Sequence, residues 1–259
     1  MKINKTAELG VCFSFIVALQ ACSSIQSESN AIKEELVSPA PDAGFIEHPE
    51  LQKKRADLPF QKVWVKTGFQ MSAYQEMVVP PVNTQYMMEM DWLHKASSAN
   101  VISDVKKDTA DLAKYFRDQI VKEFKQDPKK RFQIIETEQQ HKKPALRLEI
   151  ALVEIDPSQP VLHALSWAGP PGTGTAAGLI NQRTAAFEGR LRDMQTGEIV
   201  VTFADRDTQD AGPLDLTRLT WYGPAKGIMD QWAKQFVQIA NRKPGEMVTD
   251  PTAFTLRPF

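Results

Sequence analysis

The chain has 259 residues, of which 42% are hydrophobic, 24% charged and 8% aromatic, and its formal net charge is −1. These values are typical of globular proteins and exclude the collagen-like, disordered and polytopic membrane classes. Because 31 basic residues balance 32 acidic ones, the chain offers no broad electrostatic attraction for nucleic acid or anionic lipid.

The first 21 residues have the pattern of a secretory signal peptide. Two lysines lie within the first five residues, an apolar run follows over residues 9–19, and small residues precede Cys22. As a helix, this run would rise only about 16 Å, roughly half the thickness of the bilayer core. We therefore expect no permanent transmembrane anchor here.

Leu19-Gln20-Ala21-Cys22 resembles the lipobox of bacterial lipoproteins. The resemblance implies cleavage before Cys22, a diacylglyceryl thioether on its sulfur and acylation of the new amino terminus, and several acyl chains hold a protein firmly at a membrane. Ser23 and Ser24 are not acidic, which resembles the outer-membrane sorting signal of enteric-type bacteria. We expect a lipid-anchored outer-membrane protein on the periplasmic face, with exposure at the cell surface left open. The alternative is an ordinary signal peptide with a chance cysteine.

The chain has only two cysteines, Cys12 and Cys22. Cys12 would leave with the signal peptide and Cys22 would carry lipid, so the mature chain would hold no thiol and no disulfide. Cysteine nucleophiles, thiolate metal sites and redox motifs are then excluded, and stability must come from a hydrophobic core.

The expected domain organisation follows from composition. Residues 22–43 are rich in Ser, Glu, Ala and Pro without an apolar period, which predicts a lipidated N-terminus and flexible tether. We expect the folded domain over residues 44–245 and a C-terminal tail over 246–259.

The first half of the domain predicts two strands and a long helix. Strands are expected over 61–66 and 74–82, with the second ended by a proline pair. Apolar side chains then recur at steps of three or four, which predicts a helix over 103–126. Ser103 is suited to its N-cap, and Asp127-Pro128 to its end.

The second half predicts strands and a closing helix. A short strand is expected over 132–137, and alternation over 146–152 predicts a half-buried strand with a bulge at 153–155. Segments 184–193 and 199–203 predict a hairpin whose loop places Gly197 at a positive φ. A last helix is expected over 224–242.

A helix between two strands implies a right-handed crossover and at least one parallel pair. The remaining strands are suited to antiparallel pairing, and both helices pack most simply on one face. The sequence therefore predicts one α/β (α+β) domain with a single mixed sheet and two main helices on one face.

No catalytic constellation is found. Residues 169–176 resemble a nucleotide-binding loop, but Thr175 and Ala176 replace the lysine and hydroxyl that such a loop needs. The four histidines never have metal-ligand spacing. Asp205 and Asp207 resemble part of a calcium loop that lacks its glutamate, so we expect a solvated turn there. We expect no catalytic residue, metal, cofactor, nucleotide or nucleic acid.

Two segments are candidate partner-contacting surfaces. The first is methionine-rich and aromatic, and the second is a Gly/Pro loop. The candidate residues are Tyr86, Met87, Met88, Met90 and Trp92 in the first and Gly172 and Gly174 in the second. The alternatives are a connection folded over the core and a plain flexible loop.

The carboxylates Glu149, Glu188 and Asp193 lie at outward strand positions, where they could be neighbours. Such acids are ordinary salt-bridge partners on most sheet surfaces. A pair of them facing a cleft would instead suit glycoside hydrolysis.

Several pieces together resemble a family of uncharacterised bacterial envelope lipoproteins, the domain-of-unknown-function family thirty-three thirteen. They are Gly44-Phe45-Ile46, residues 74–82, Phe187-Glu188-Gly189, residues 193–198, Asp205-Arg206-Asp207, Trp221 and Trp232-Ala233, and they span about residues 44 to 240. The family has no established activity, so the resemblance implies no catalytic residue. The element order also resembles α/β domains of lipoproteins that act as accessory subunits, such as penicillin-binding-protein activators and curli-secretion-type proteins, an analogy at the level of fold.

We therefore expect a non-enzymatic binding or accessory subunit of an envelope complex, with an envelope protein as partner and the membrane reached through Cys22. The alternative is a hydrolase that acts on an envelope polymer through Glu149 and Glu188.

Overall fold

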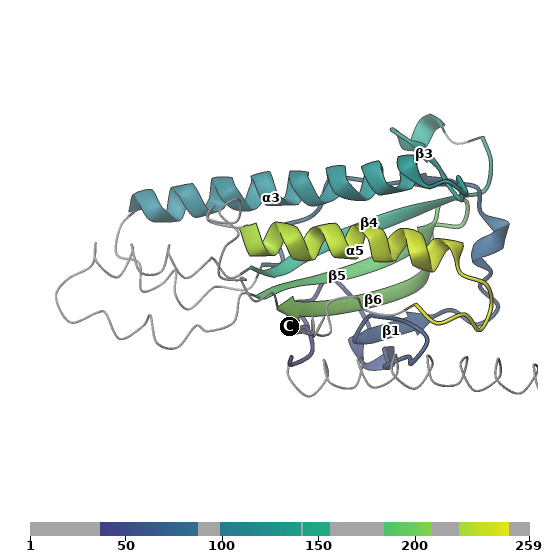
Figure 1. Cartoon of the computed structure of the whole chain (residues 1–259), viewed down its shortest axis with the longest axis horizontal. Coiled ribbons are helices and arrows are strands. Elements are labelled where there is room, and N and C mark those ends of the chain that lie inside the picture. Colours follow the sequence, from purple (N-terminus) through teal and green to yellow (C-terminus); the bar gives the residue numbers. More distant parts are fainter. Residues whose placement is uncertain (1–36, 88–98, 141, 156–183, 209–222, 249–259) are drawn as a thin grey trace, which may run out of the picture.

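The computed structural model describes residues 37–87, 99–140, 142–155, 184–208 and 223–248 (Figure 1). Six strands form one mixed sheet in the order β1-β6-β5-β4-β2-β3, and helices α3 and α5 lie side by side over one face. The elements are β1 (Lys62–Val65), β2 (Glu76–Val78), α3 (Ala99–Gln126), β3 (Gln133–Ile135), β4 (Ala145–Ile155), β5 (Thr184–Asp193), β6 (Ile199–Thr208) and α5 (Gly223–Asn241), with short 3₁₀ helices η1 (Pro49–Leu51), η2 (Met71–Ala73) and η3 (Glu138–Gln140).

The pairing confirms the predicted mixed sheet. β2 pairs in parallel with β3 across the α3 crossover, and also in parallel with β4. β4, β5, β6 and β1 pair antiparallel in that order. The register shifts between Leu152 and Glu154, which confirms the bulge, and Gly197 has φ +75° in the hairpin loop.

The strand predicted over 74–82 is shorter than expected. Only Glu76–Val78 form β2, because the two prolines that follow have no N–H to donate to a ladder. The chain returns to the sheet at Asn83, which forms a parallel bridge with Ala151. α3 begins at Ala99, four residues before the expected start at 103.

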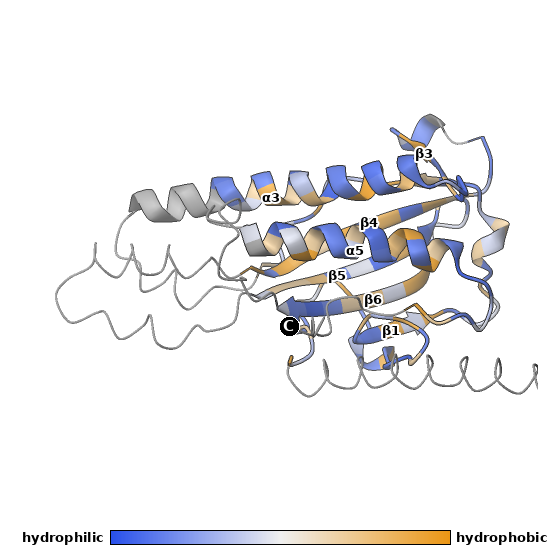
Figure 2. Ribbon diagram, in the orientation of Figure 1, coloured by the Kyte–Doolittle hydropathy of each residue, from blue (hydrophilic) through white to orange (hydrophobic). Residues whose placement is uncertain are grey.

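The two helices pack their apolar stripes on the sheet. Leu112, Phe116 and Ile120 of α3 are buried, as are Ile228 and Trp232 of α5. Figure 2 shows hydrophilic and hydrophobic residues alternating along both helices, as expected of amphipathic elements. Within the described residues, no helix is both long and apolar enough to cross a bilayer.

Two hydrogen bonds show that α3 and α5 run in the same direction. Tyr115 of α3 donates its hydroxyl hydrogen to Asp230 of α5 at 2.7 Å. Near the C-terminal ends, the amide of Asn241 donates to Asp127 at 2.9 Å. Both helices therefore end at the same end of the sheet, as Figure 1 shows.

The core between helices and sheet is aromatic. The rings of Phe187 and Trp232 meet edge to face with centroids 4.6 Å apart. The indole N–H of Trp232 donates to Asp205 at 2.9 Å, and the backbone N–H of Gln61 donates to the same carboxylate at 3.2 Å. Asp205 is 0% exposed and Asp207 is buried. The predicted solvated turn is thus wrong, because both residues lie within β6.

A segment of irregular chain, residues 37–46, covers part of the opposite face of the sheet; we call it the strap. Its Ala40, Phe45 and Ile46 pack on small apolar residues of the strands, namely Ala151, Val153, Ala186 and Ala204. Gln61 accepts the Ala40 N–H and donates to the Val37 carbonyl, both at 3.1 Å.

The strap corrects the expected domain boundaries. Val37 is only 6% exposed, so the prediction of a flexible tether to residue 43 is wrong for residues 37–43. The side chains of Gln61 and Glu188 bind the strap through its backbone N–H groups. Because this binding does not depend on the strap's own side chains, it gives the strap no apolar period in its sequence. At the other end, Val248 is also buried and donates its N–H to the Asp57 carbonyl at 3.1 Å, so packing extends into the predicted tail.

Candidate functional site

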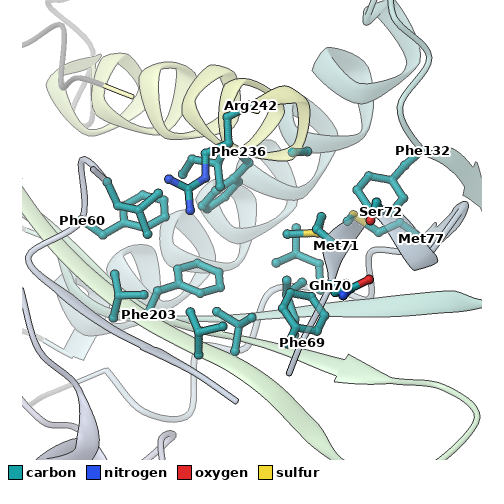
Figure 3. Close-up of a pocket in the computed structure, with 18 of the residues that line it drawn as sticks. Phe60, Phe69, Gln70, Met71, Ser72, Met77, Phe132, Phe203, Phe236 and Arg242 are labelled. Carbon is teal, nitrogen blue, oxygen red and sulfur yellow. The ribbon is translucent and has the colours of Figure 1, made fainter. Parts of the chain in front are cut away.

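A cavity of about 650 Å³ opens between the helix layer and the sheet, where α5 ends. Figure 3 shows Phe236 and Arg242 on the α5 side, Phe203 and Phe69 opposite them, and Gln70, Met71 and Ser72 along another wall. The apolar lining residues are Leu58, Phe60, Val63, Val65, Phe69, Met71, Met77, Phe124, Phe132, Leu148, Leu191, Val201, Phe203, Phe236, Ile239, Ala240 and Pro244.

Separate elements supply these walls. Val63 comes from β1, and Leu148, Leu191 and Phe203 come from the helix-facing sides of β4, β5 and β6. α5 adds its last turn with Ile239. The cavity is therefore the place where the two layers diverge beyond the aromatic core.

The turn η2 forms one edge of the mouth, and an arginine holds it in place. The guanidinium of Arg131 donates to the carbonyls of Met71 and Tyr74, the latter at 2.8 Å, and lies 4.4 Å above the centroid of the Phe132 ring. Burial lowers the pKa of Arg131. Since the guanidinium binds two backbone carbonyls, its role is to fix the mouth.

Three cations line the cavity: Arg55, Arg242 and Lys243. The guanidinium of Arg55 donates to both carboxylate oxygens of Asp57, at 2.9 and 2.7 Å, and Arg242 donates to the same carboxylate at 2.5 Å. The hydrogen bond from Arg55, joined by Arg242, holds the pKa of Asp57 far below its usual range. Asp57 therefore stays ionised and sets both guanidinium groups side by side.

A second carboxylate lies near the mouth. Glu246 accepts the backbone N–H of Lys243 at 2.8 Å. The described lining itself carries these three cations and no carboxylate, and Asp57 forms ion pairs with two of the three. The polar lining of the cavity is completed by Gln70 and Ser72.

The three sequence-predicted carboxylates lie away from this cavity and are bound within the structure. Glu149 pairs with Arg190, Arg192 and Arg147. Burial raises the pKa of Glu149, but the hydrogen bonds and charges of Arg190 and Arg192 outweigh it and hold the pKa below its usual value. Glu149 was predicted to point outward and therefore to be exposed, but its side chain is buried.

Glu188 is 1% exposed and lies under the strap. Its carboxylate accepts the N–H groups of Ala43 and Phe45 at 3.1 and 3.0 Å. Burial raises the pKa of Glu188 above its ordinary value, and the backbone N–H donors only partly offset this. Asp193, the third carboxylate, accepts the Tyr74 hydroxyl at 2.7 Å and two backbone N–H groups of its own hairpin loop.

Two predicted partner-contacting residues lie among the described residues. Tyr86 is partly buried and meets the Phe45 ring edge to face, with centroids 5.3 Å apart. Met87 packs partly buried against the main core. The contacts of both residues match the alternative expectation for this segment, a connection that folds over the core. The remaining predicted residues, Met88, Met90, Trp92, Gly172, Gly174 and the lipidation candidate Cys22, lie outside the described residues.

The described lining of the cavity combines apolar residues with three cations and two uncharged polar side chains. Its described lining contains no aspartate, glutamate, histidine or cysteine. Elsewhere in the described part of the chain, no three metal-ligating side chains gather. The sequence analysis did not predict this cavity, because its walls come from segments far apart in the chain. The one local signal was the basic pair Arg242-Lys243, and by itself such a pair indicates only a favourable charge at a helix C-terminus.

Comparison with solved structures finds the PelC dodecamer from Paraburkholderia phytofirmans in one crystal form and a point variant of it in another. Each is 9% identical, with a TM-score of 0.37, and the match covers 70% of this chain and 98% or 97% of PelC. No curated protein sequence matches the chain.

The model of one protein family matches residues 41–236, and its description is "Protein of unknown function (DUF3313)". The match runs from the strap to the last helix and includes every strand of the sheet. The chain therefore belongs to the DUF3313 family, as its motifs predicted.

Proposed function

We propose that this protein is an outer-membrane-anchored lipoprotein whose domain is a non-enzymatic binding or accessory subunit of an envelope complex. The observation that carries the proposal is the cavity, with apolar walls and a cationic mouth and no acid–base pair in its described lining. Such a site binds and orients a ligand, whereas hydrolysis needs a positioned acid and base. The lipobox-like sequence ending at Cys22 supports the anchor.

The partners of the sheet carboxylates also favour binding over hydrolysis. Glu149 is surrounded by arginines, and Glu188 is occupied by the backbone of the strap. A glycosidase needs two carboxyl groups that face a substrate from opposite sides. We infer that Glu149 and Glu188 stabilise the sheet and its cover.

The anchor is tested by cell fractionation of a Cys22→Ala variant. We expect the wild-type protein in the outer-membrane fraction and the variant in the soluble fraction, because the acyl chains are lost with the sulfur. Cys12→Ala is the matched control, since that cysteine would leave with the signal peptide and its loss should change nothing. Retention of the Cys22→Ala variant in the membrane would contradict the anchor.

The partner is tested by photo-cross-linking in the native host. A photoreactive residue at position 90 or 174 is expected to capture a defined envelope protein, since both segments are predicted partner surfaces. Lys122, exposed on α3, provides the control position. Identical products from all three positions would show that neither segment contacts a specific partner.

A further inference from the structure

We propose that the cavity binds the acyl chain of a single-chain lipid, with the anionic headgroup held at Arg55, Arg242 and Lys243. This inference rests on the proposed binding role of the same cavity and names its ligand class. It depends on neither the anchor nor an envelope partner.

The walls favour an alkyl chain over a peptide. Between the sheet and α5 the lining is aliphatic and aromatic, and its uncharged polar groups, Gln70 and Ser72, lie on the η2 side. A peptide inserted here would bury backbone N–H and carbonyl groups without partners, which is costly. An alkyl chain brings no polar group and needs none.

The size of the cavity suits one chain. Ligand-binding clefts have volumes of about 300–1,000 Å³, and this apolar-walled cavity of about 650 Å³ lies within that range. At about 30 Å³ for each water-sized group, this space holds about 20 such groups. One acyl chain of ordinary length fits, whereas a lipid with two long chains would exceed the space.

The charged residues of the described lining are all cations, which suits a ligand with one anionic end. Arg55 and Arg242 share Asp57, and Lys243 has no carboxylate within ion-pair distance among the described residues. The third cation, Lys243, is therefore left to pair with a negative headgroup. The near-neutral chain as a whole has no such preference, so the selectivity would be local.

Calorimetric titration tests the proposal on the mature chain carrying Cys22→Ala, which needs no detergent. The probes are dodecanoate, dodecyl phosphate and dodecyltrimethylammonium, each below its micelle concentration. We expect both anions to bind at least tenfold more tightly than the cation. The tighter of the two anions identifies a carboxylate or a phosphate head as the natural source.

Two exposed positions allow variants with little risk to folding. Ser72→Trp places an indole in the mouth and should weaken all three probes at least tenfold, while Ala73→Trp, on the same turn but outside the lining, should not. Lys243→Glu should weaken the two anions about tenfold and spare the cation, a change of about 1.4 kcal/mol. Lys234→Glu, exposed on α5 away from the cavity, is its control.

Three results would overturn the proposal. The first is absence of binding by all probes, and the second is equal binding of anions and cation. The third is unchanged binding in Ser72→Trp, which would place the probes elsewhere. Self-association that Ser72→Trp abolishes, with no lipid binding, would assign the cavity to a second copy of the chain. None of these results bears on Cys22, so the anchor stands or falls separately.

Discussion

Glu188 lies on β5, and Gln61 directly precedes β1. The buried side chain of each residue binds the backbone of the strap. Glu188 alternates with inward-facing Phe187 and Gly189, and this alternation correctly separates the two faces of β5. Alternation states which face a side chain lies on, but not whether another segment covers that face. The sequence could therefore predict the position of Glu188 on the sheet but not its burial.

Tyr74 provides a prediction at the scale of one residue. Burial, together with its hydrogen bond to Asp193, raises the pKa of Tyr74 to about 12 from 10.0. The neutral phenol is the bonded form, so its stabilisation is complete below pH 10 and is lost as the pH rises through about 12. We expect Tyr74→Phe to lower the free energy of unfolding by about 1.5 kcal/mol at pH 7 and to lose less stability than wild type between pH 9 and 12.

Urea unfolding at a series of pH values measures both effects. The pKa of Tyr115 is also raised, by burial and by Asp230, and this contribution is common to both proteins. The difference between wild type and Tyr74→Phe therefore isolates Tyr74. Parallel stability curves for the two proteins up to pH 12 would contradict the assignment.

At the scale of elements, the type of each element was predicted where the apolar pattern is long, although α3 begins four residues before the expected start and β6 continues to Thr208, past the expected end at 203. β4, β5 and β6 have ten or eleven residues each, and α3 has 28, so their periods are unambiguous. β2 and β3 have three residues each, too few to define a period, and their ends were misplaced. The parallel pairing of these short strands was still predictable, because the helix between them requires a crossover.

Gly189 gives the prediction for β5. A Cβ at this position would lie 2.5 and 2.6 Å from two ring atoms of Phe203 on the neighbouring strand. The Phe203 ring packs against Phe60, Phe187 and Phe236, so moving it away from a new methyl group disturbs these aromatic contacts. We expect Gly189→Ala to lower the free energy of unfolding by about 1–3 kcal/mol in urea denaturation.

A double-mutant cycle supplies the control. Phe203→Leu removes the ring atoms nearest the new methyl group, so Gly189→Ala should cost less in that background. Equal costs in the two backgrounds would mean that the loss comes from the strand backbone rather than from the ring.

The whole molecule has three layers: helices, sheet and strap. Sequence patterns predicted the first two, since each helix and each long strand has its own period. The strap and the cavity have no such local basis. The strap is held through its backbone, and the cavity depends on where separately specified elements diverge.

The strap leads to a prediction about the whole chain, tested by comparing chains that begin at residues 23, 37 and 47. The first two should unfold at the same urea concentration, because residues 23–36 belong to the flexible tether that their composition predicts. The third uncovers the apolar patch around Ala151 and Ala186 and loses Phe45 and Ile46, so we expect it to be at least about 3 kcal/mol less stable. If that chain fails to fold, Phe45→Ala in the full chain tests the same cover, since Phe45 packs on Tyr86 and lies 4.3 Å from the Arg190 guanidinium. Equal stability of the three chains and of Phe45→Ala would mean that the sheet needs no cover on this face.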